Sequence, residues 1–394
     1  MQKIFYKGRS IFAKEFLHIL NNGGIKSIFS CLKLFRTALK DERINEFEDK
    51  AVLFFLIPPI PSESFKRHLR HYTNKFVLKN GDTLFGQAFI AVNRKCPFNC
   101  WYCSAGNSPD KEPAIDELDR MINLCRDWGA STIVFTGGEP LLRNDIDELI
   151  ERYSKELSFV ILTSGYGLNK ERAKKLKDSG LFSISISLDH YDPKVNDQSR
   201  GKDGAFNIAV NAIENAKKAK LYTVVQTVAT KILLQDGDIE EFINFMKSLD
   251  VDELFLLEPL CTGRLFERKE GHYLNNDELE RLKLLHTQFS KEKNGLKIIT
   301  SPFIEDPEKF GCGAGTQHIY IDTEGNLWPC NFLPVSIGNI LREPEIVESR
   351  LKRYFNKPCS YCILKKHHKE LLEFFDDTLP IKFEHAQGIL EKMS

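Results

Sequence analysis

Short hydrophobic runs and amphipathic helical patterns alternate regularly over the middle of the chain. The runs lie at 88–92, 132–135, 159–162, 182–188, 222–228 and 254–257, and the helical patterns between them lie near 114–128, 145–156, 169–179, 204–218 and 238–248. Buried strands that alternate with helices form a parallel sheet with right-handed crossovers. Six such strands are too few to close an eight-stranded barrel. The pattern therefore predicts an α/β fold with a partial (β/α)6 barrel that is open on one side.

The segments on either side of this barrel have different patterns. Residues 1–84 indicate a mostly helical N-terminal extension, and the barrel is expected over 85–300. A small domain rich in glycine and cysteine, with a hairpin-like pattern at 319–328, is expected over 301–370, and a helical tail over 371–394.

The most hydrophobic stretch of the extension is 51–60, which includes Pro58 and Pro59. A membrane span needs about 20 apolar residues, so this stretch cannot cross a bilayer, and we expect no transmembrane segment. We expect a buried strand or packing segment here. The alternative is a surface that contacts a lipid or another apolar substrate.

Composition and charge exclude some classes of function. Lys and Arg together number 55, as do Asp and Glu, so the formal net charge is zero. Nucleic-acid binding without sequence preference needs a basic surface, and we therefore expect no nucleic-acid partner. The first ten residues are polar and show no secretory signal, which predicts a cytoplasmic protein.

Three of the ten cysteines, Cys96, Cys100 and Cys103, lie within eight residues directly after the first predicted strand. Cysteines of a cytoplasmic protein rarely form a disulfide framework. Three thiolates bind three irons of a four-iron cluster and leave the fourth iron open. A structural zinc ion prefers four protein ligands, and no fourth Cys or His follows at a suitable spacing. The pattern favours an iron–sulfur cluster.

The C-x3-C-x2-C spacing, with Tyr102 just before the last cysteine, resembles the signature of the radical S-adenosylmethionine (radical SAM) superfamily. The segment 136–140 at the end of the second strand resembles the Gly-Gly-Glu-Pro motif of that superfamily. Glycines there let the backbone approach a ligand and leave N–H groups free to bind it. The resemblance implies that Gly137, Gly138, Glu139 and Pro140 hold the amino group of S-adenosylmethionine, with Tyr102 beside the cofactor.

Weaker matches follow at the ends of later strands. The resemblance places four more residues near S-adenosylmethionine, namely Ser164, Ser187, Arg200 and Gln226. Arginine suits a bidentate grip on a carboxylate. Where the superfamily often has Ser-x-Asp-Gly, this protein has His190 in place of the glycine, so the contacts of Ser187 and Asp189 stay open. All these positions lie at the carboxyl ends of parallel strands, where α/β folds bind ligands.

A second group of cysteines comprises Cys312, Cys330, Cys359 and Cys362. Its spacing resembles the shortened, single-cluster auxiliary domain of the superfamily, called twitch, which is related to the longer SPASM domain. Four thiolates would saturate a second 4Fe–4S cluster, which would suit electron transfer. A four-cysteine zinc site is the alternative.

The resemblance implies reductive cleavage of S-adenosylmethionine and hydrogen abstraction by a 5′-deoxyadenosyl radical, with two 4Fe–4S clusters and a flavodoxin- or ferredoxin-type electron donor. Three substrate classes stay open: a sugar-like small molecule, a ribosomal peptide and a lipid. A non-catalytic electron-transfer protein is the remaining alternative. No catalytic acid or base can be assigned, since Asp189, His190 and Asp192 are candidates by position alone.

Overall fold

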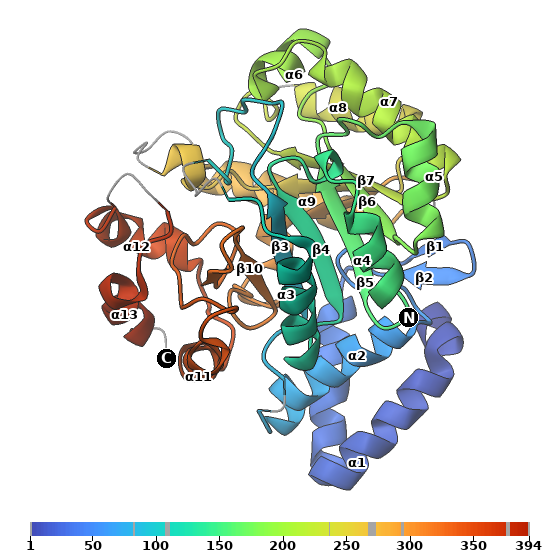
Figure 1. Cartoon of the computed structure of the whole chain (residues 1–394). Coiled ribbons are helices and arrows are strands. Elements are labelled where there is room, and N and C mark those ends of the chain that lie inside the picture. The colour runs from blue at the N-terminus through green and yellow to red at the C-terminus, as the bar shows by residue number, and fades with distance from the viewer. Residues whose placement is uncertain are drawn as a thin grey trace.

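The computed structural model describes residues 2–81, 83–106, 111–235, 237–266, 273–292, 295–375 and 379–392, with side chains from residue 7 onward. A twisted, mostly parallel sheet lies at the centre, with helices along its outer face (Figure 1). The six predicted strands are present in sequence order. They are β3 (Gln87–Asn93), β4 (Thr132–Gly137), β5 (Ser158–Thr163), β6 (Ser183–Ser187), β7 (Tyr222–Val228) and β8 (Glu253–Leu257).

Five helices between these strands match the predicted pattern. They are α3 (Ile115–Asp127), α4 (Ile146–Tyr153), α5 (Lys170–Asp178), α7 (Ala205–Lys218) and α8 (Asp238–Ser248). The structure adds two short helices that were not predicted, η2 (Pro140–Leu142) and α6 (Pro193–Arg200). Polar side chains begin several of them. Asn169 accepts from the backbone N–H of Arg172 at the start of α5, and Asp192 accepts from two N–H groups at the start of α6. Such caps satisfy donors that have no partner within the helix. The partial barrel is therefore confirmed.

The sheet extends beyond the predicted six strands. Within the described part of the protein it has nine, in the order β11-β10-β3-β4-β5-β6-β7-β8-β9. At one edge β9 (Lys297–Thr300) pairs parallel to β8, and at the other β10 (His318–Ile321) pairs parallel to β3. β11 (Leu327–Trp328) pairs antiparallel to β10, as the hairpin pattern predicted. The curled sheet remains open, because its edge strands, β9 and β11, do not pair with each other.

The N-terminal extension covers one end of the sheet. It contains α1 (Gln2–Leu39), which bends at Gly24, a two-stranded sheet of β1 (Asn45–Phe47) and β2 (Lys50–Val52), α2 (Glu63–Tyr72) and the π-helix η1 (Thr73–Leu78). The stretch 51–60 is held by a bridge between Ala51 and Ile60, and Phe55 is fully buried. Most of the stretch is therefore buried, as expected for a packing segment, whereas Leu53, Phe54 and Ile57 are half-buried.

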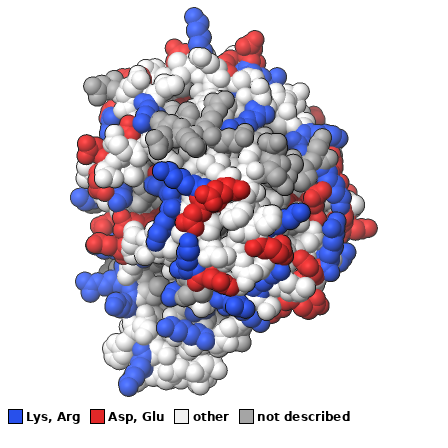
Figure 2. Space-filling view, turned by 90° about the vertical axis from the view of Figure 1, so that its left-hand side faces the viewer, with Lys and Arg blue, Asp and Glu red and all other residues white. Residues whose placement is uncertain are grey.

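The remaining elements follow the barrel. They are η3 (Gly263–Leu265), α9 (Asn276–Ser290), α10 (Ser301–Ile304), α11 (Pro344–Tyr354), α12 (Ile363–Leu372) and α13 (Phe383–Glu391). The last three lie beside β10 and β3 at the left of Figure 1. Acidic and basic side chains alternate over this face, as expected for a protein with no net charge (Figure 2). Among the described residues, no helix has the length and hydrophobicity that a membrane crossing needs.

Candidate functional site

The three clustered cysteines lie in the loop after β3, at the carboxyl end of the sheet. Cys100 is buried, Cys103 is half-buried and Cys96 is exposed. Burial raises the pKa of the Cys100 thiol to about 11, and the nearby Cys103 and Cys96 contribute to that shift. The three sulfur atoms therefore lie close enough to influence one another.

This arrangement differs from a site for a single ion. No three Cys, His, Asp or Glu side chains in the described part of the protein converge tightly enough to hold one metal ion. A four-iron cluster needs a wider arrangement, because each thiolate binds a different iron. Three neighbouring thiols with no fourth protein ligand fit such a cluster better than they fit zinc.

The two glycines that follow β4 pack against the start of the cysteine loop. A Cβ atom at Gly137 or Gly138 would collide with the backbone carbonyl of Asn93 or Lys95. The N–H of Gly138 donates to Asn93 O at 2.8 Å, and the N–H of Glu139 donates to Lys95 O at 2.8 Å. The expectation that the glycine N–H groups are free for a ligand is therefore wrong at Gly138. The glycines are needed here for close backbone contact.

The carboxylate of Glu139 points away from solvent and is completely buried. It accepts from the hydroxyl of Thr163 at 2.5 Å, from the backbone N–H of Ser164 at 2.8 Å and from the Ser164 hydroxyl. It also accepts from the N–H of Leu141, while Pro140 begins η2. Two predicted site residues, Glu139 and Ser164, are thus brought together. In this structure they are hydrogen-bonded to each other, whereas both were predicted to contact S-adenosylmethionine.

Tyr102, Asp189 and Arg200 form a second cluster beside the cysteines. The Tyr102 hydroxyl donates to Asp189 and accepts from the guanidinium of Arg200 at 3.0 Å. Arg200 and Asp189 also form an ion pair at 3.6 Å. Burial raises the pKa of Tyr102 well above its ordinary value. Two predicted cofactor residues therefore share one network, whose acidic member is Asp189.

The buried polar atoms near this rim that have no hydrogen-bond partner within the described structure include Nε of Arg200 and Oδ1 of Asn93. The Nδ2 of Asn93 donates to the backbone carbonyl of Glu139 at 2.8 Å. A buried polar group without a partner is costly unless a ligand completes it. A donor and an acceptor therefore remain for an amino acid head group. Sequence reasoning missed Asn93, although its place directly before the cysteine loop was a signal.

The other candidates have clear positions. Ser187 and Gln226 pair in register across β6 and β7, so they share one face of the sheet. Asp192 caps α6, and its N–H donates to Nδ1 of His190 at 2.9 Å. The cap on α6 and this hydrogen bond account for the polar side chains of His190 and Asp192. Neither residue is thereby assigned as a catalytic acid or base.

The linker after β8 also holds the cysteine loop. The N–H of Arg264 donates to Cys103 O at 3.0 Å, and its guanidinium donates to Cys100 O at 3.0 Å and to Asn99. Gly263 has φ +53°, and a Cβ atom there would lie 2.5 Å from Ser104 O. Arg264 therefore supports the loop.

The second group of cysteines also gathers in space. Cys312 and Cys359 pair as an antiparallel bridge, with N–H to O distances of 2.8 and 3.2 Å. Burial raises the pKa of both Cys330 and Cys362 to about 12, with further contributions from neighbouring charges that include Glu305. These thiols are protonated near neutral pH unless a metal replaces the proton.

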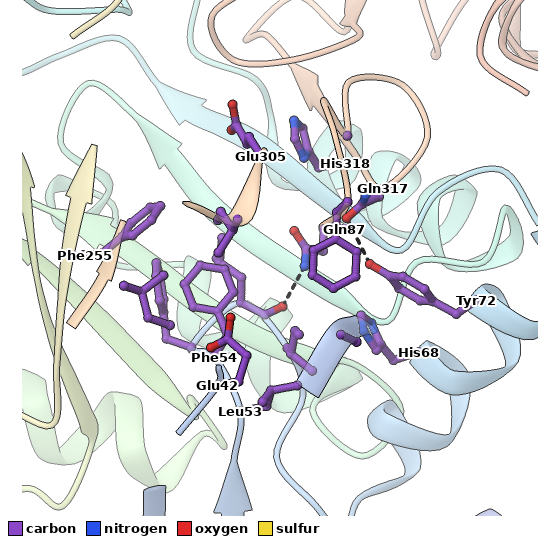
Figure 3. Close-up of a pocket in the computed structure, with 18 of the residues that line it drawn as sticks. Glu42, Leu53, Phe54, His68, Tyr72, Gln87, Phe255, Glu305, Gln317 and His318 are labelled. Atoms are coloured by element: carbon purple, nitrogen blue, oxygen red, sulfur yellow. Dashed lines mark hydrogen bonds between the residues drawn. The ribbon is translucent and has the colours of Figure 1, made fainter. Parts of the chain in front are cut away.

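A cavity of about 210 Å³ lies at the open side of the barrel (Figure 3). It is lined from both sides of the curled sheet, by His318 of β10 with Gln87 and Phe89 of β3, and by Phe255 of β8 with Ile299 of β9. The segment 53–57 and the inner side of α1 add further walls, and Gln226 and Cys330 lie at its border. The cavity thus reaches both the strand ends and the second cysteine group.

Comparisons with known proteins agree with this arrangement. A family model described as the Radical SAM superfamily matches residues 90–246. The AdoMet-dependent heme synthase of Methanosarcina barkeri is 28% identical over 276 residues, which cover 63% of this chain and 77% of that protein. The GTP 3′,8-cyclase of Nautilia profundicola is 33% identical over 296 residues, which cover 68% of this chain and 89% of that protein.

A similar fold is found in SuiB of Streptococcus suis, solved with S-adenosylmethionine. The match has a TM-score of 0.53 at 22% identity and covers 68% of this chain and 65% of SuiB, so it spans slightly less than two thirds of that protein. At this identity the likeness concerns the fold.

Proposed function

The chain belongs to the radical SAM superfamily, and on this premise we propose that it cleaves S-adenosylmethionine reductively and removes a hydrogen atom from its substrate, with net oxidation or bond formation assisted by a second cluster. The observation that carries the proposal is the gathering of Cys96, Cys100 and Cys103 in a loop whose first residues, 93–95, pack against Gly137 and Gly138. When bound, a reduced four-iron cluster with S-adenosylmethionine supplies a 5′-deoxyadenosyl radical.

The residues around the cysteines have separate tasks in this proposal. Arg200 offers its unpartnered Nε to the carboxylate of S-adenosylmethionine, and Oδ1 of Asn93 accepts from the amino group. Tyr102 and Asp189 hold the Arg200 guanidinium in place. Glu139 keeps the loop after β4 and the loop after β5 together through Thr163 and Ser164.

Gln226 and Ser187 share the sheet face that borders the cavity, and in the proposal they lie near the ribose. Their polar groups offer hydrogen bonds at the strand ends, where the wall of the cavity is otherwise hydrophobic.

Cys312, Cys330, Cys359 and Cys362 hold the second 4Fe–4S cluster in this proposal, as in a twitch-type domain. Four thiolates leave no open iron, so this group suits removal of an electron from the substrate radical. An external flavodoxin- or ferredoxin-type protein in the cytoplasm would deliver the first electron.

The names of the relatives do not identify the reaction, since one is a heme synthase and another a GTP cyclase. SuiB has also been solved with its precursor peptide SuiA, and a peptide substrate for this protein would rest on that likeness of fold alone.

The test is anaerobic reconstitution of the protein with iron and sulfide, followed by an assay for 5′-deoxyadenosine with a chemical reductant. We expect about eight irons per molecule from two four-iron clusters and formation of 5′-deoxyadenosine. Cys100→Ala should abolish that product and about half of the iron, whereas Cys125→Ala, at a buried cysteine of α3, should change neither. Undiminished product from Cys100→Ala would refute the proposal.

A further inference from the structure

The walls of the cavity are mainly hydrocarbon. Phe54 and Phe55 form edge-on aromatic pairs with ring centroids 4.8 Å apart, and both contact Phe255, at 5.4 and 5.6 Å. Leucine and isoleucine side chains from α1, β5, β8 and β9 complete the wall. Apolar cavities of about 150 Å³ already bind small hydrocarbons in preference to water. A cavity of about 210 Å³ with these walls suits an apolar ligand.

Three polar side chains of the cavity wall have partners within the protein, whereas the buried hydroxyl of Thr73 has none in the described structure. Tyr72 donates to Gln317 at 3.1 Å, and Gln87 donates to the carbonyl of Leu56 at 3.1 Å (Figure 3). His68 bonds the Ser131 hydroxyl at 3.0 Å.

Burial lowers the pKa of His68 to about 3 and that of His318 to about 4, so both imidazoles are neutral near pH 7. Burial of an uncompensated polar group costs free energy. A sugar or a charged peptide would therefore find few partners along most of this wall.

Two carboxyl groups border the cavity, Glu42 just after α1 and Glu305 near the second cysteine group (Figure 3). Glu42 lies 3.3 Å from His286, and burial together with the neighbouring Glu258 raises the pKa of Glu305 to about 7. The cavity therefore has an apolar stretch between these two carboxyl groups. A ligand with a hydrocarbon tail fits this distribution of polar and apolar groups, if the carbon that reacts lies toward the strand ends.

Helix α1 has a second hydrophobic face that packs against nothing in the described structure. Its inner face contributes Leu34, Phe35 and Ala38 to the cavity. The outer face exposes large side chains on both halves of the bent helix, at Phe16, Leu17, Leu20, Ile25, Phe29 and Leu32. Ile25 and Phe29 are 66% and 68% exposed, which is unusual for side chains of this size.

The exposed charges of the same helix have one sign. Lys14, Lys26, Lys33 and Arg36 are exposed, as is Lys40 directly after the helix, whereas Glu15, the one acidic residue from 7 to 40, is buried and pairs with Arg70 at 2.9 Å. The lowest part of the molecule in Figure 2 accordingly shows blue and white side chains without red. Hydrophobic and basic side chains on one exposed helix are the pattern of a helix that lies on an anionic membrane.

We infer that α1 docks on the surface of an anionic bilayer and that the cavity behind it receives the hydrocarbon tail of a membrane lipid, which is the substrate. The reaction on this lipid rests on the proposed function, whereas its binding does not. One helix forms both the docking face and a wall of the cavity, so a lipid tail that leaves the bilayer meets the apolar side chains that α1 contributes to the cavity. A second copy of the protein does not suit the outer face, because pairing would bring two rows of lysines together.

The first test measures docking by co-flotation with vesicles of phosphatidylglycerol and phosphatidylcholine. We expect binding that weakens with salt and disappears with phosphatidylcholine alone. Loss of three charges in Lys26→Gln/Lys33→Gln/Arg36→Gln should lower binding by about 100-fold. The matched variant Lys170→Gln/Lys174→Gln/Lys218→Gln, at exposed sites on α5 and α7, should bind as the wild type does. Equal binding by both triple variants, or none by the wild type, would overturn the docking.

The second test measures binding of a hydrocarbon tail with the fluorescent fatty acid cis-parinaric acid. Ala38→Trp fills part of the cavity from α1 and should reduce the fluorescence increase at least tenfold, whereas Ala13→Trp at an exposed site of α1 should not. Circular dichroism of both variants checks that they fold. Unaltered binding by a folded Ala38→Trp, or no binding by the wild type, would overturn the assignment of the cavity.

The third test asks whether the lipid is the substrate, and it distinguishes that question from whether the protein cleaves S-adenosylmethionine. The reconstituted enzyme is incubated with lipids extracted from expressing cells grown in deuterated medium, and the 5′-deoxyadenosine is analysed for deuterium. In the proposed step a C–H bond of the lipid tail breaks and its hydrogen atom moves to the 5′ carbon, with a one-electron reductant supplied. Product without deuterium would overturn the lipid substrate and leave the proposed function standing. Absence of any 5′-deoxyadenosine would refute the proposed function, while the two binding tests still decide docking and the cavity.

Discussion

Gly263 lies directly against Cys103. The carbonyl oxygen of Cys103 accepts from the N–H of Arg264 at 3.0 Å and occupies the space that a side chain at Gly263 would need. Gly263 also adopts φ +53°, a conformation that residues with a side chain rarely adopt. The loop after β8 therefore packs closely against the backbone of the loop after β3.

This contact makes Gly263→Ala a test of the cysteine loop. The added methyl group cannot be accommodated without a shift of Cys103 or Ser104, because its neighbours are backbone atoms. We expect the variant to fold and to lose about half of the iron bound after reconstitution, since one of two four-iron clusters would be missing. Gly237→Ala, which has φ +89° and open space around it, bears similar backbone strain without the collision and should keep its iron.

Tyr102→Phe tests the network around Arg200. The variant removes a hydroxyl that donates to Asp189 and accepts from Arg200, and leaves the ring in place. Hydrogen bonds to charged groups contribute about 1.5–3 kcal/mol, so we expect the Kd for S-adenosylmethionine to rise about tenfold or more. Equilibrium dialysis with the labelled cofactor measures it. Tyr153→Phe, whose hydroxyl bonds Asp119 on the outer helices, is the control. An unchanged Kd for Tyr102→Phe would separate this network from the cofactor.

Cys362→Ala separates the two cysteine groups. Cys362 begins α12 and is one of four thiols of the second group. Its loss should halve the iron content while 5′-deoxyadenosine still forms, because the loop after β3 is untouched. Conversion of substrate to product should stop if the second cluster accepts an electron. Metal analysis of the wild type decides the alternative, because four thiolates occupied by zinc would contradict two iron–sulfur clusters.

Glu253→Gln tests a buried carboxyl at the opposite end of the barrel. Glu253 accepts from Tyr222 at 3.1 Å, and burial raises its pKa from 4.5 to about 7 despite the nearby Lys297. The neutral form is favoured in the folded state, so its contribution to stability is complete below pH 4.5 and is lost as the pH rises through 7. Between pH 4.5 and 8 the wild type should lose up to about 3 kcal/mol relative to the variant.

Thermal unfolding at pH 5 and pH 8 measures this difference. Glu148→Gln, at an exposed site of α4, should follow the wild type at both values. If Glu253→Gln shows the same pH dependence as the wild type, the carboxyl is already ionised at the lower pH.

The sequence predicted the barrel well because its strands are buried on both faces and its helices have one apolar stripe. All seven residues of β3 are buried, which explains the unbroken hydrophobic run there. β9 and β10 were harder to predict as parts of the same sheet. β9 begins with Lys297, which is buried through its contacts in the folded protein, and four residues are too few to show a period. Their pairing partners, β8 and β3, are far away in the sequence.

The sequence predicted which residues lie at the candidate site. It predicted less well which of them contact one another. Sequence motifs brought Glu139, Ser164, Tyr102 and Arg200 to one edge of the sheet, and the structure places them in two separate networks there. The cavity could not be predicted from local patterns. Its wall combines α1, the segment 53–57, both sides of the curled sheet and residues near Cys330, and only the fold brings these together.

The pairing of β10 with β3 connects the two cysteine groups through adjacent strands. β3 leads into the loop of Cys96, and β10 lies between Cys312 and Cys330, with His318 opposite Gln87 and Ile321 opposite Ile90. Any redox centres held by these loops would be linked through strands that pair by main-chain hydrogen bonds. Electron transfer between them would therefore run along one continuous sheet.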